Sequence, residues 1–170
     1  RGEPRPLDLA AVVRDAVGLL GSTLPSSLEL SLDLPEGLPP VNLDPVHVEQ
    51  VLMNLCINAR DAMEGAGRVR VAAAVRDLSE GVCASCRQPV QGRFVELAVG
   101  DSGPGIAPAH LERIFEPFFT TKPVGKGSGM GLSTVHGIVH EYGAHLMVDR
   151  APREGTVFRV LFPALDAPGL

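Results

Sequence analysis

Residues 101–105 read Asp-Ser-Gly-Pro-Gly, residues 115–122 read Phe-Glu-Pro-Phe-Phe-Thr-Thr-Lys, and residues 125–132 read Gly-Lys-Gly-Ser-Gly-Met-Gly-Leu. Glycine has no Cβ and adopts positive φ readily, so the backbone of such a segment can approach a ligand closely. A glycine-rich segment directly before an apolar helix is typical of a mobile loop whose amides close over phosphates. The spacing matches neither a P-loop nor the glycine motif of a dinucleotide fold. We therefore expect a phosphate-binding loop of another kind.

Composition limits the remaining possibilities. The 170 residues are 45% hydrophobic, which predicts one globular domain over residues 1–170 with a core from about 7 to 163. A net charge of −5, no Trp and one Tyr argue against nucleic acid as a partner. Three cysteines are too few for a disulfide framework, and no apolar run approaches the roughly 20 residues of a membrane span. The sequence begins without Met and shows no signal-peptide pattern, so we expect a piece of a longer protein, and the few cysteines make a reducing cytoplasm the expected location.

The order of helices and strands predicts an α+β fold. Asp8 and Asp44-Pro45 are helix-start signals. Apolar residues at helical or alternating spacing predict the following elements: helices over about 8–20, 44–63 and 131–142, and strands over about 28–34, 41–43, 68–75, 93–100, 145–149 and 155–162. Residues 164–170 read as a linker. We expect a two-layer sandwich, a mixed, mostly antiparallel sheet of about five strands with about three helices on one face.

Two polar features of this pattern suggest a ligand. Asn54, Asn58 and Asp61 recur at spacings of four and three, so they share one face of the second predicted helix. Asparagine is unfavourable in helix interiors, so this pattern suggests a ligand, and an amide oxygen can bind a hard cation such as Mg²⁺. The alternative interpretation is a helix face exposed to solvent. Asp101 ends an apolar strand, where its carboxylate can accept a hydrogen bond from the exocyclic amine of adenine. Gly103 and Gly105 would then admit the base, whereas an ordinary turn is the alternative.

The combination resembles the ATP-binding catalytic domain of sensor histidine kinases, which has the Bergerat fold and shares a superfamily with DNA gyrase B, mismatch-repair and heat-shock ATPases. Four motifs carry the resemblance in the family's order. They are Asn-x-x-x-Asn at 54–58 (N box), Asp-x-Gly-x-Gly at 101–105 (G1 box), Phe-x-Pro-Phe at 115–118 (F box) and Gly-x-Gly-x-Gly-Leu at 127–132 (G2 box). It covers roughly residues 7–163.

The resemblance implies a role for each matching residue. Asn58 would coordinate Mg²⁺, and Asp101 would recognise adenine. The residues that would bind ATP are Asn54, Asn58, Asp61, Ala62, Asp101, Gly103, Gly105, Ile106, Lys122, Gly127, Gly129, Gly131, Leu132 and Thr156. Residues from about 106 to 129 would form a lid over the nucleotide. Phe115 and Phe118 would pin that lid or dock a partner domain, with ordinary core packing as the equal alternative.

The activity implied is that of a protein-histidine kinase in two-component signal transduction. ATP–Mg²⁺ would supply the γ-phosphoryl group to a histidine on a separate dimerisation domain, and a response regulator would act downstream. No acceptor-histidine motif is present, so we expect no catalytic residue within this piece, no autophosphorylation by it alone, and a monomer. The alternatives are a gyrase- or chaperone-type ATPase and a non-catalytic nucleotide-binding regulatory module. Asn54 argues against the ATPase, because an amide cannot act as a general base.

Cys83 and Cys86 lie in the loop between two predicted strands. Their spacing suits half of a zinc site, but a structural zinc site takes four ligands, and Cys56 belongs to the core face of a helix. An ordinary hairpin tip is the favoured interpretation, with a redox or dimer contact as the remainder. His136 and His140 share a helix face and are expected at surface or core positions without a catalytic role.

Overall fold

The computed structural model describes residues 3–21, 24–106, 108–111, 113–117, 119, 131–151 and 155–165. The predicted residues Lys122, Gly127, Gly129 and Phe118 lie outside them. In chain order the described elements are β1 (Arg5–Leu7), α1 (Leu9–Leu20), β2 (Leu28–Asp33), β3 (Val41–Leu43), α2 (Pro45–Ala62), β4 (Gly67–Leu78), β5 (Gly92–Asp101), a 3-10 turn η1 (Pro108–His110), α3 (Gly131–Glu141), β6 (His145–Ala151) and β7 (Gly155–Pro163).

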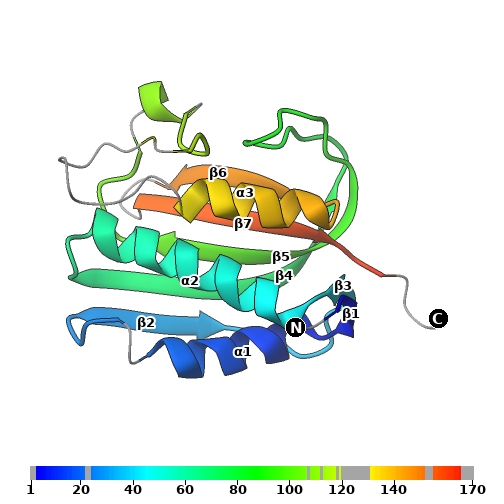
Figure 1. The fold of residues 1–170 in the computed structure, drawn as a ribbon, viewed down its shortest axis with the longest axis horizontal. Helices are drawn as coiled ribbons and strands as arrows, with labels where there is room; N and C mark the ends of the chain where they lie inside the picture. The colour runs from blue at the N-terminus through cyan, green and yellow to red at the C-terminus, as the bar shows by residue number, and fades with distance from the viewer. Residues whose placement is uncertain are drawn as a thin grey trace.

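The main sheet has five strands in the order β2-β4-β5-β7-β6. β2 runs parallel to β4, and the other three pairings are antiparallel. The three helices lie over one face of this sheet, and β1 pairs with β3 beside it (Figure 1). The predicted α+β sandwich with a mixed, mostly antiparallel sheet is confirmed.

Two helices begin where the sequence signals predicted. Asp8 caps α1 by accepting a hydrogen bond from the Ala10 N–H at 3.2 Å. Asp44 caps α2 by accepting from the Val46 N–H at 3.0 Å, and Pro45 occupies the first turn. In both cases the side chain satisfies an amide that has no partner within the helix.

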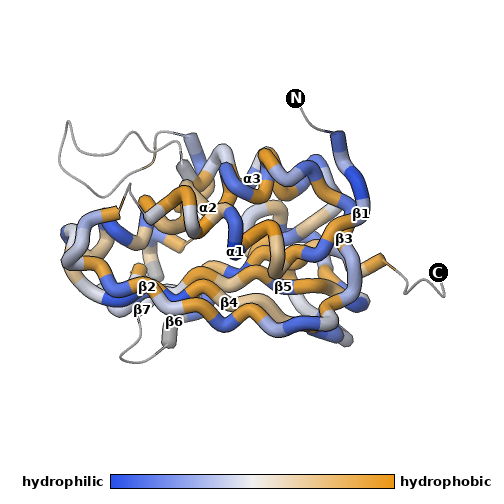
Figure 2. Tube along the Cα trace, turned by 90° about the horizontal axis from the view of Figure 1, so that it is seen from below, coloured by the Kyte–Doolittle hydropathy of each residue, from blue (hydrophilic) through white to orange (hydrophobic). Residues whose placement is uncertain are grey.

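The core lies between the helix layer and the sheet, where Figure 2 shows apolar positions of both layers facing each other. The register places Val95 opposite Phe162, Leu97 opposite Val160 and Val99 opposite Phe158, so these pairs share the helix-facing side. The helices contribute the buried faces of α1 (Leu9, Val13, Ala16, Leu20) and α2 (Val48, Val51, Leu52, Leu55, Cys56, Ala59). Polar residues on the intervening positions of α2 are therefore left at the margins of this layer.

The other face of the sheet carries a charge ladder. Glu96 of β5 is 4% exposed and accepts from Arg76 of β4 at 3.1 Å and from Arg159 of β7 at 3.2 Å. Arg159 also pairs with Asp149 of β6 at 2.5 Å. These carboxylates raise the pKa of Arg159 despite its partial burial, which alone would lower it. The ladder ties four neighbouring strands together by their side chains.

Several boundaries differ from the sequence prediction. β1 was not predicted, because three residues carry no measurable periodicity. The alternating leucines of β2 are less buried than expected: Leu28 is buried but Leu32 is 43% exposed, on a strand at the edge of the sheet. Residues 164 and 165 were expected to be linker, yet their N–H groups donate to the Arg93 and Pro40 carbonyls at 3.1 and 2.9 Å.

In the part of the chain that the structure describes, no helix combines the length and the apolar character needed to cross a bilayer.

Candidate nucleotide-binding site

Asp101 closes β5 and is the most buried acid among the predicted site residues, with 6% of its surface exposed. Its Oδ1 accepts from the Gly103 N–H at 2.9 Å and from the Thr156 N–H at 3.5 Å. Burial raises the pKa of this carboxyl, and the two N–H groups offset the increase only in part. A carboxylate fixed by two backbone amides has a set orientation and is costly to leave without a further partner.

Glycines allow the chain to close around this carboxylate. A methyl group on Gly155, whose φ is +73°, would lie 2.6 Å from both Asp101 Oδ1 and the Gly103 carbonyl oxygen. One on Gly103 would lie 3.1 Å from Asp101 Oδ1 and from Met63 Cγ. The missing Cβ at Gly103 therefore allows the end of α2 to pack against the end of β5, a packing role that the sequence did not predict.

Met63 connects the strand-end turn to α2. It caps the helix, and its sulfur accepts from the Ser102 hydroxyl at 3.3 Å. Ser102 in turn accepts from the Arg68 N–H at 2.9 Å at the start of β4. The C-terminal end of α2, the start of β4 and the end of β5 thus meet at one end of the molecule (Figure 1).

The polar stripe of α2 runs toward this end. Asn54, Asn58 and Asp61 are all half-buried, whereas Ala62 is exposed at the last helical position. Arg60 pairs with Asp61, its Nη2 lying 3.0 Å from Asp61 Oδ1. The predicted shared face exists, and Asp61 faces a cation supplied by its own helix.

The N-terminal end of α3 lies on the same side of the sheet as the C-terminal end of α2 (Figure 1). Gly131 begins α3 and is exposed, and a methyl group there would meet no atom within 4 Å. Leu132 and Ile106 are half-buried and pack against the core, and Gly105 adopts φ +82°. The structure thus brings Asp101, Thr156, the α2 stripe and the start of α3 to one end.

Phe115 packs onto β7 near the same end, against Phe158, which is two residues from Thr156 and pairs with Val99 of β5. Phe115 is 8% exposed, and its ring meets Phe158 of β7 edge-on with the ring centroids 6.3 Å apart. This placement favours the core interpretation of Phe115 over a docking role.

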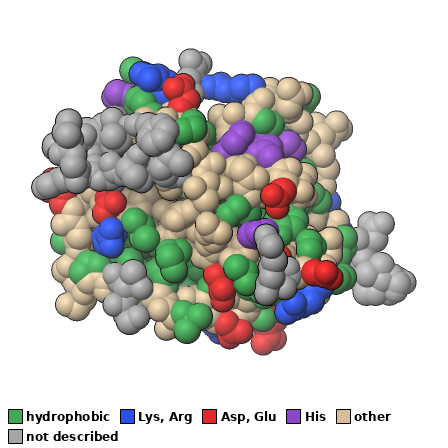
Figure 3. Space-filling view, viewed as in Figure 1, with side chains coloured by type: hydrophobic (Ala, Val, Ile, Leu, Met, Phe, Trp, Pro, Cys, Tyr) green, Lys and Arg blue, Asp and Glu red, His purple; other side chains and the backbone are tan. Residues whose placement is uncertain are grey.

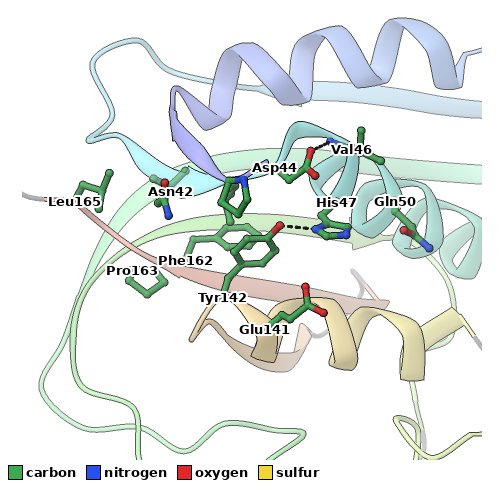
Figure 4. Close-up of a pocket in the computed structure, with 13 residues that line it drawn as sticks. Asn42, Asp44, Val46, His47, Gln50, Glu141, Tyr142, Phe162, Pro163 and Leu165 are labelled. Carbon is green, nitrogen blue, oxygen red and sulfur yellow. Dashed lines mark hydrogen bonds between the residues drawn. The ribbon is translucent and has the colours of Figure 1, made fainter. Parts of the chain in front are cut away.

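A cavity of about 800 Å³ lies at the opposite end of α2 (Figure 4). It is lined by residues near the start of α2, the end of α3 and the end of β7, among them Asp44, His47, Tyr142 and Phe162. A hydrogen bond joins His47 Nδ1 to the Tyr142 hydroxyl. None of the predicted ATP-binding residues lines it. Its size alone therefore does not make it the nucleotide site.

The sequence did not predict that one group of cysteine and histidine side chains would meet. Cys83, Cys86, His140 and His145 come together in the structure, although His140 was expected at a surface or core position without a catalytic role. Cys-x-x-Cys and His-x-x-x-x-His were each visible in the sequence, but nothing in it showed that the two pairs meet.

Solved structures with this fold include the nucleotide-free catalytic domain of the histidine kinase ThkA, with TM-score 0.74, 25% identity and 95% and 96% of the two chains covered. Full-length ShkA in complex with AMPPNP superposes with TM-score 0.73 at 26% identity, over 99% of this chain and 33% of that one. The fold of this chain is thus that of the catalytic domain of histidine kinases.

The sequence matches the family described as histidine kinase-, DNA gyrase B- and HSP90-like ATPase over residues 43–166, and the chain belongs to that family. It is 39% identical over 162 residues to the sensor kinase CckA of Brucella abortus and 42% identical over 172 residues to the two-component sensor PprA of Pseudomonas aeruginosa. These alignments cover 95% and 98% of this chain but only 17% of each relative.

Proposed function

We propose that this chain binds ATP with Mg²⁺ and presents the γ-phosphoryl group to a histidine on a separate dimerisation domain of the same protein. The observation that carries the proposal is the buried Asp101 carboxylate, held by two backbone amides at the end of the molecule where the α2 stripe and the start of α3 converge. Membership in the ATPase family and the named histidine kinase relatives support it.

Asp101 supplies the specificity for adenine in this proposal. Its carboxylate would accept a hydrogen bond from the N6 amine, and the backbone N–H groups of Gly103 and Thr156 already orient Oδ1. Guanine carries a carbonyl oxygen where adenine carries the amine, so two acceptors would face each other without a proton between them. A buried carboxylate therefore discriminates between the two purines.

The α2 stripe fits a magnesium ion bound to phosphates. Asn54 and Asn58 offer neutral, hard oxygen donors at half-buried positions, and Mg²⁺ takes few protein ligands when phosphates supply the rest. Asn58 would hold the ion, Asn54 would line the same pocket, and Asp61 would act through water. The ion would neutralise charge that develops on the phosphates during transfer.

The phosphate chain is assigned to the glycine-rich segment and the start of α3. Gly131 and Leu132 occupy the first turn of α3, where unpaired backbone N–H groups favour an anion. Gly127, Gly129 and Lys122 complete the proposed phosphate contacts. Transfer would depend mainly on positioning and charge neutralisation, and the amide of Asn54 offers no base to activate water.

The remaining parts of the proposal concern partners. The phosphoryl group would pass from the acceptor histidine to a response regulator, and this chain alone would be monomeric and act in the cytoplasm. The test is label transfer: with γ-labelled ATP, a histidine-bearing dimerisation domain of the same protein should acquire acid-labile phosphate only when this chain is present. Tight ATP binding without transfer would contradict the kinase assignment and leave a regulatory module. Steady-state release of phosphate by this chain alone would favour an ATPase.

A further inference from the structure

The loop between β4 and β5 reaches the far edge of the sheet. Within residues 79–91, the Ala84 N–H donates to the Leu146 carbonyl at 2.7 Å, and the Leu146 N–H donates to Cys83 Sγ at 3.3 Å. Leu146 belongs to β6, an edge strand, so the loop satisfies backbone groups that would otherwise lack a strand partner. Figure 1 shows this loop beside the C-terminal end of α3.

Four side chains from three segments meet there. Cys83 and Cys86 come from the loop, His140 from the last turn of α3, and His145 from the first residue of β6. Each offers one ligand atom, and all four atoms lie within 4.8 Å of one another. Figure 3 shows histidine side chains gathered on the helix-bearing face, over the position of α3.

The distances fit a tetrahedral ion. Zinc bonds of about 2.3 Å to sulfur and about 2.0–2.1 Å to nitrogen at the tetrahedral angle separate sulfur from nitrogen by about 3.6 Å. Cys83 Sγ lies 3.6 Å from His140 Nε2, and Cys86 Sγ lies 3.7 Å from His145 Nδ1. Two of the sulfur–nitrogen distances therefore already match a tetrahedral site, and all four ligand atoms lie within 4.8 Å of one another.

The surroundings orient the ligand atoms. His140 Nδ1 lies 2.8 Å from the His136 carbonyl oxygen, so it carries the proton and Nε2 is left with a lone pair. Cys83 is fully buried, and its sulfur faces the N–H of Leu146 and the backbone of Ser85 and Cys86.

The loop is shaped around the cysteine pair. The Cys83 N–H donates a hydrogen bond to the Gln88 carbonyl at 2.9 Å, and the Arg87 N–H donates to the Cys83 carbonyl at 3.0 Å. Arg87, directly after the second cysteine, adopts φ +66°, an uncommon conformation for a residue with a Cβ. The loop thus forms a closed turn around the two cysteines.

We propose that Cys83, Cys86, His140 and His145 form a structural zinc site. Two thiolates and two imidazoles are the ligand set that selects zinc among abundant divalent ions, and four protein ligands leave no open position for catalysis. The site joins the β4–β5 loop and the edge strand β6 to the C-terminal end of α3. Because the opposite end of α3 is the one assigned to phosphates, the metal fixes the far end of a helix that contacts the nucleotide.

The test uses the 170-residue chain without nucleotide. After exchange into metal-free buffer it should retain one zinc per chain by elemental analysis. Replacing the zinc with Co²⁺ should give the intense visible bands of a tetrahedral ion and the near-ultraviolet bands of thiolate-to-cobalt charge transfer. Cys86→Ser and His145→Ala should each weaken zinc affinity by more than the about 10–100-fold that loss of an outer-shell partner costs.

The matched controls are Cys56→Ala, which removes the remaining cysteine, and His110→Ala, which removes a histidine of η1; both should keep one zinc and the cobalt spectrum. Zinc binding by the unmodified chain no tighter than that of a Cys83→Ser/Cys86→Ser variant would overturn the proposal. So would an octahedral cobalt spectrum, or a zinc content that His140→Ala and His145→Ala leave unchanged. The cobalt spectrum of the unmodified chain decides the matter if a variant fails to fold.

Discussion

The carboxylate of Asp101 can be converted to an amide with little change of shape. In Asp101→Asn the side-chain oxygen can still accept from the Gly103 and Thr156 N–H groups, so the turn should persist. The amide NH₂ can then be directed at the adenine amine, where two donors face each other. Loss of a hydrogen bond to a charged group costs about 1.5–3 kcal/mol, and an unsatisfied buried donor about 1–3 kcal/mol more. ATP affinity should therefore fall by roughly 100-fold or more.

The same substitution should not destabilise the chain without ligand. Since burial raises the pKa of Asp101, the folded state binds a proton more readily than the unfolded state does. This group therefore lowers the free energy of unfolding as pH rises from its unfolded pKa through its raised folded pKa. Removing the charge should abolish that pH dependence and leave stability at pH 7 equal or higher.

Isothermal titration with ATP and GTP, together with thermal unfolding between pH 4 and 8, measures both effects. The matched control is Asp77→Asn, which makes the same change at an exposed position of β4. Asparagine should weaken ATP binding far more than GTP binding, because its NH₂ can donate to the guanine carbonyl. ATP affinity within twofold of the unmodified chain would refute the assignment of Asp101 to the adenine base.

Three further predictions concern the scaffold and the metal. Gly155→Ala should lower the free energy of unfolding by at least about 1–3 kcal/mol in chemical denaturation, because its methyl group would lie 2.6 Å from Asp101 and Gly103 and the residue has a positive φ. The control Gly131→Ala should cost nothing, because its methyl group would meet no atom within 4 Å. Equal effects of the two substitutions would contradict the packing described. Glu96→Ala should lower the free energy of unfolding by about 1–3 kcal/mol, less than the loss of a fully buried ion pair, because Arg76 and Arg159 are partly exposed. An unchanged free energy of unfolding in urea would mean that the charge ladder does not stabilise the fold. At a free zinc concentration 100 times the Kd, bound zinc should stabilise the chain by about 2.7 kcal/mol, so its removal with a chelator should lower Tm by roughly 5–11 °C. An unchanged Tm in differential scanning calorimetry would argue against the site.

Local signals in the sequence were sufficient for most of the fold. Asp8 and Asp44 start their helices as predicted because capping depends on neighbouring atoms alone. The alternation of β2 was a weaker guide, since the burial of Leu32 depends on the place of the strand at the edge of the sheet, which alternation does not encode. The short β1 and the bonded residues 164–165 depend on partners distant in sequence, and no local pattern encodes them.

The candidate site was partly predictable for the same reason. Asn54 and Asn58 follow helical spacing and Asp101 ends an apolar strand, so the element and face of each could be assigned from the sequence. The role of Gly103 and Gly155 in closing the turn around Asp101 depends on the approach of α2 and β7, which is a tertiary property. The Cys–His group shows the limit most clearly, because half of its ligands lie more than fifty residues from the other half.

The most direct measurement is a crystal structure of this chain with AMPPNP and Mg²⁺. The adenine amine should lie within hydrogen-bonding distance of the Asp101 carboxylate, the ion on Asn58, and the phosphates at the start of α3. Nucleotide bound instead in the cavity between the start of α2 and Tyr142, or an adenine turned away from Asp101, would contradict it.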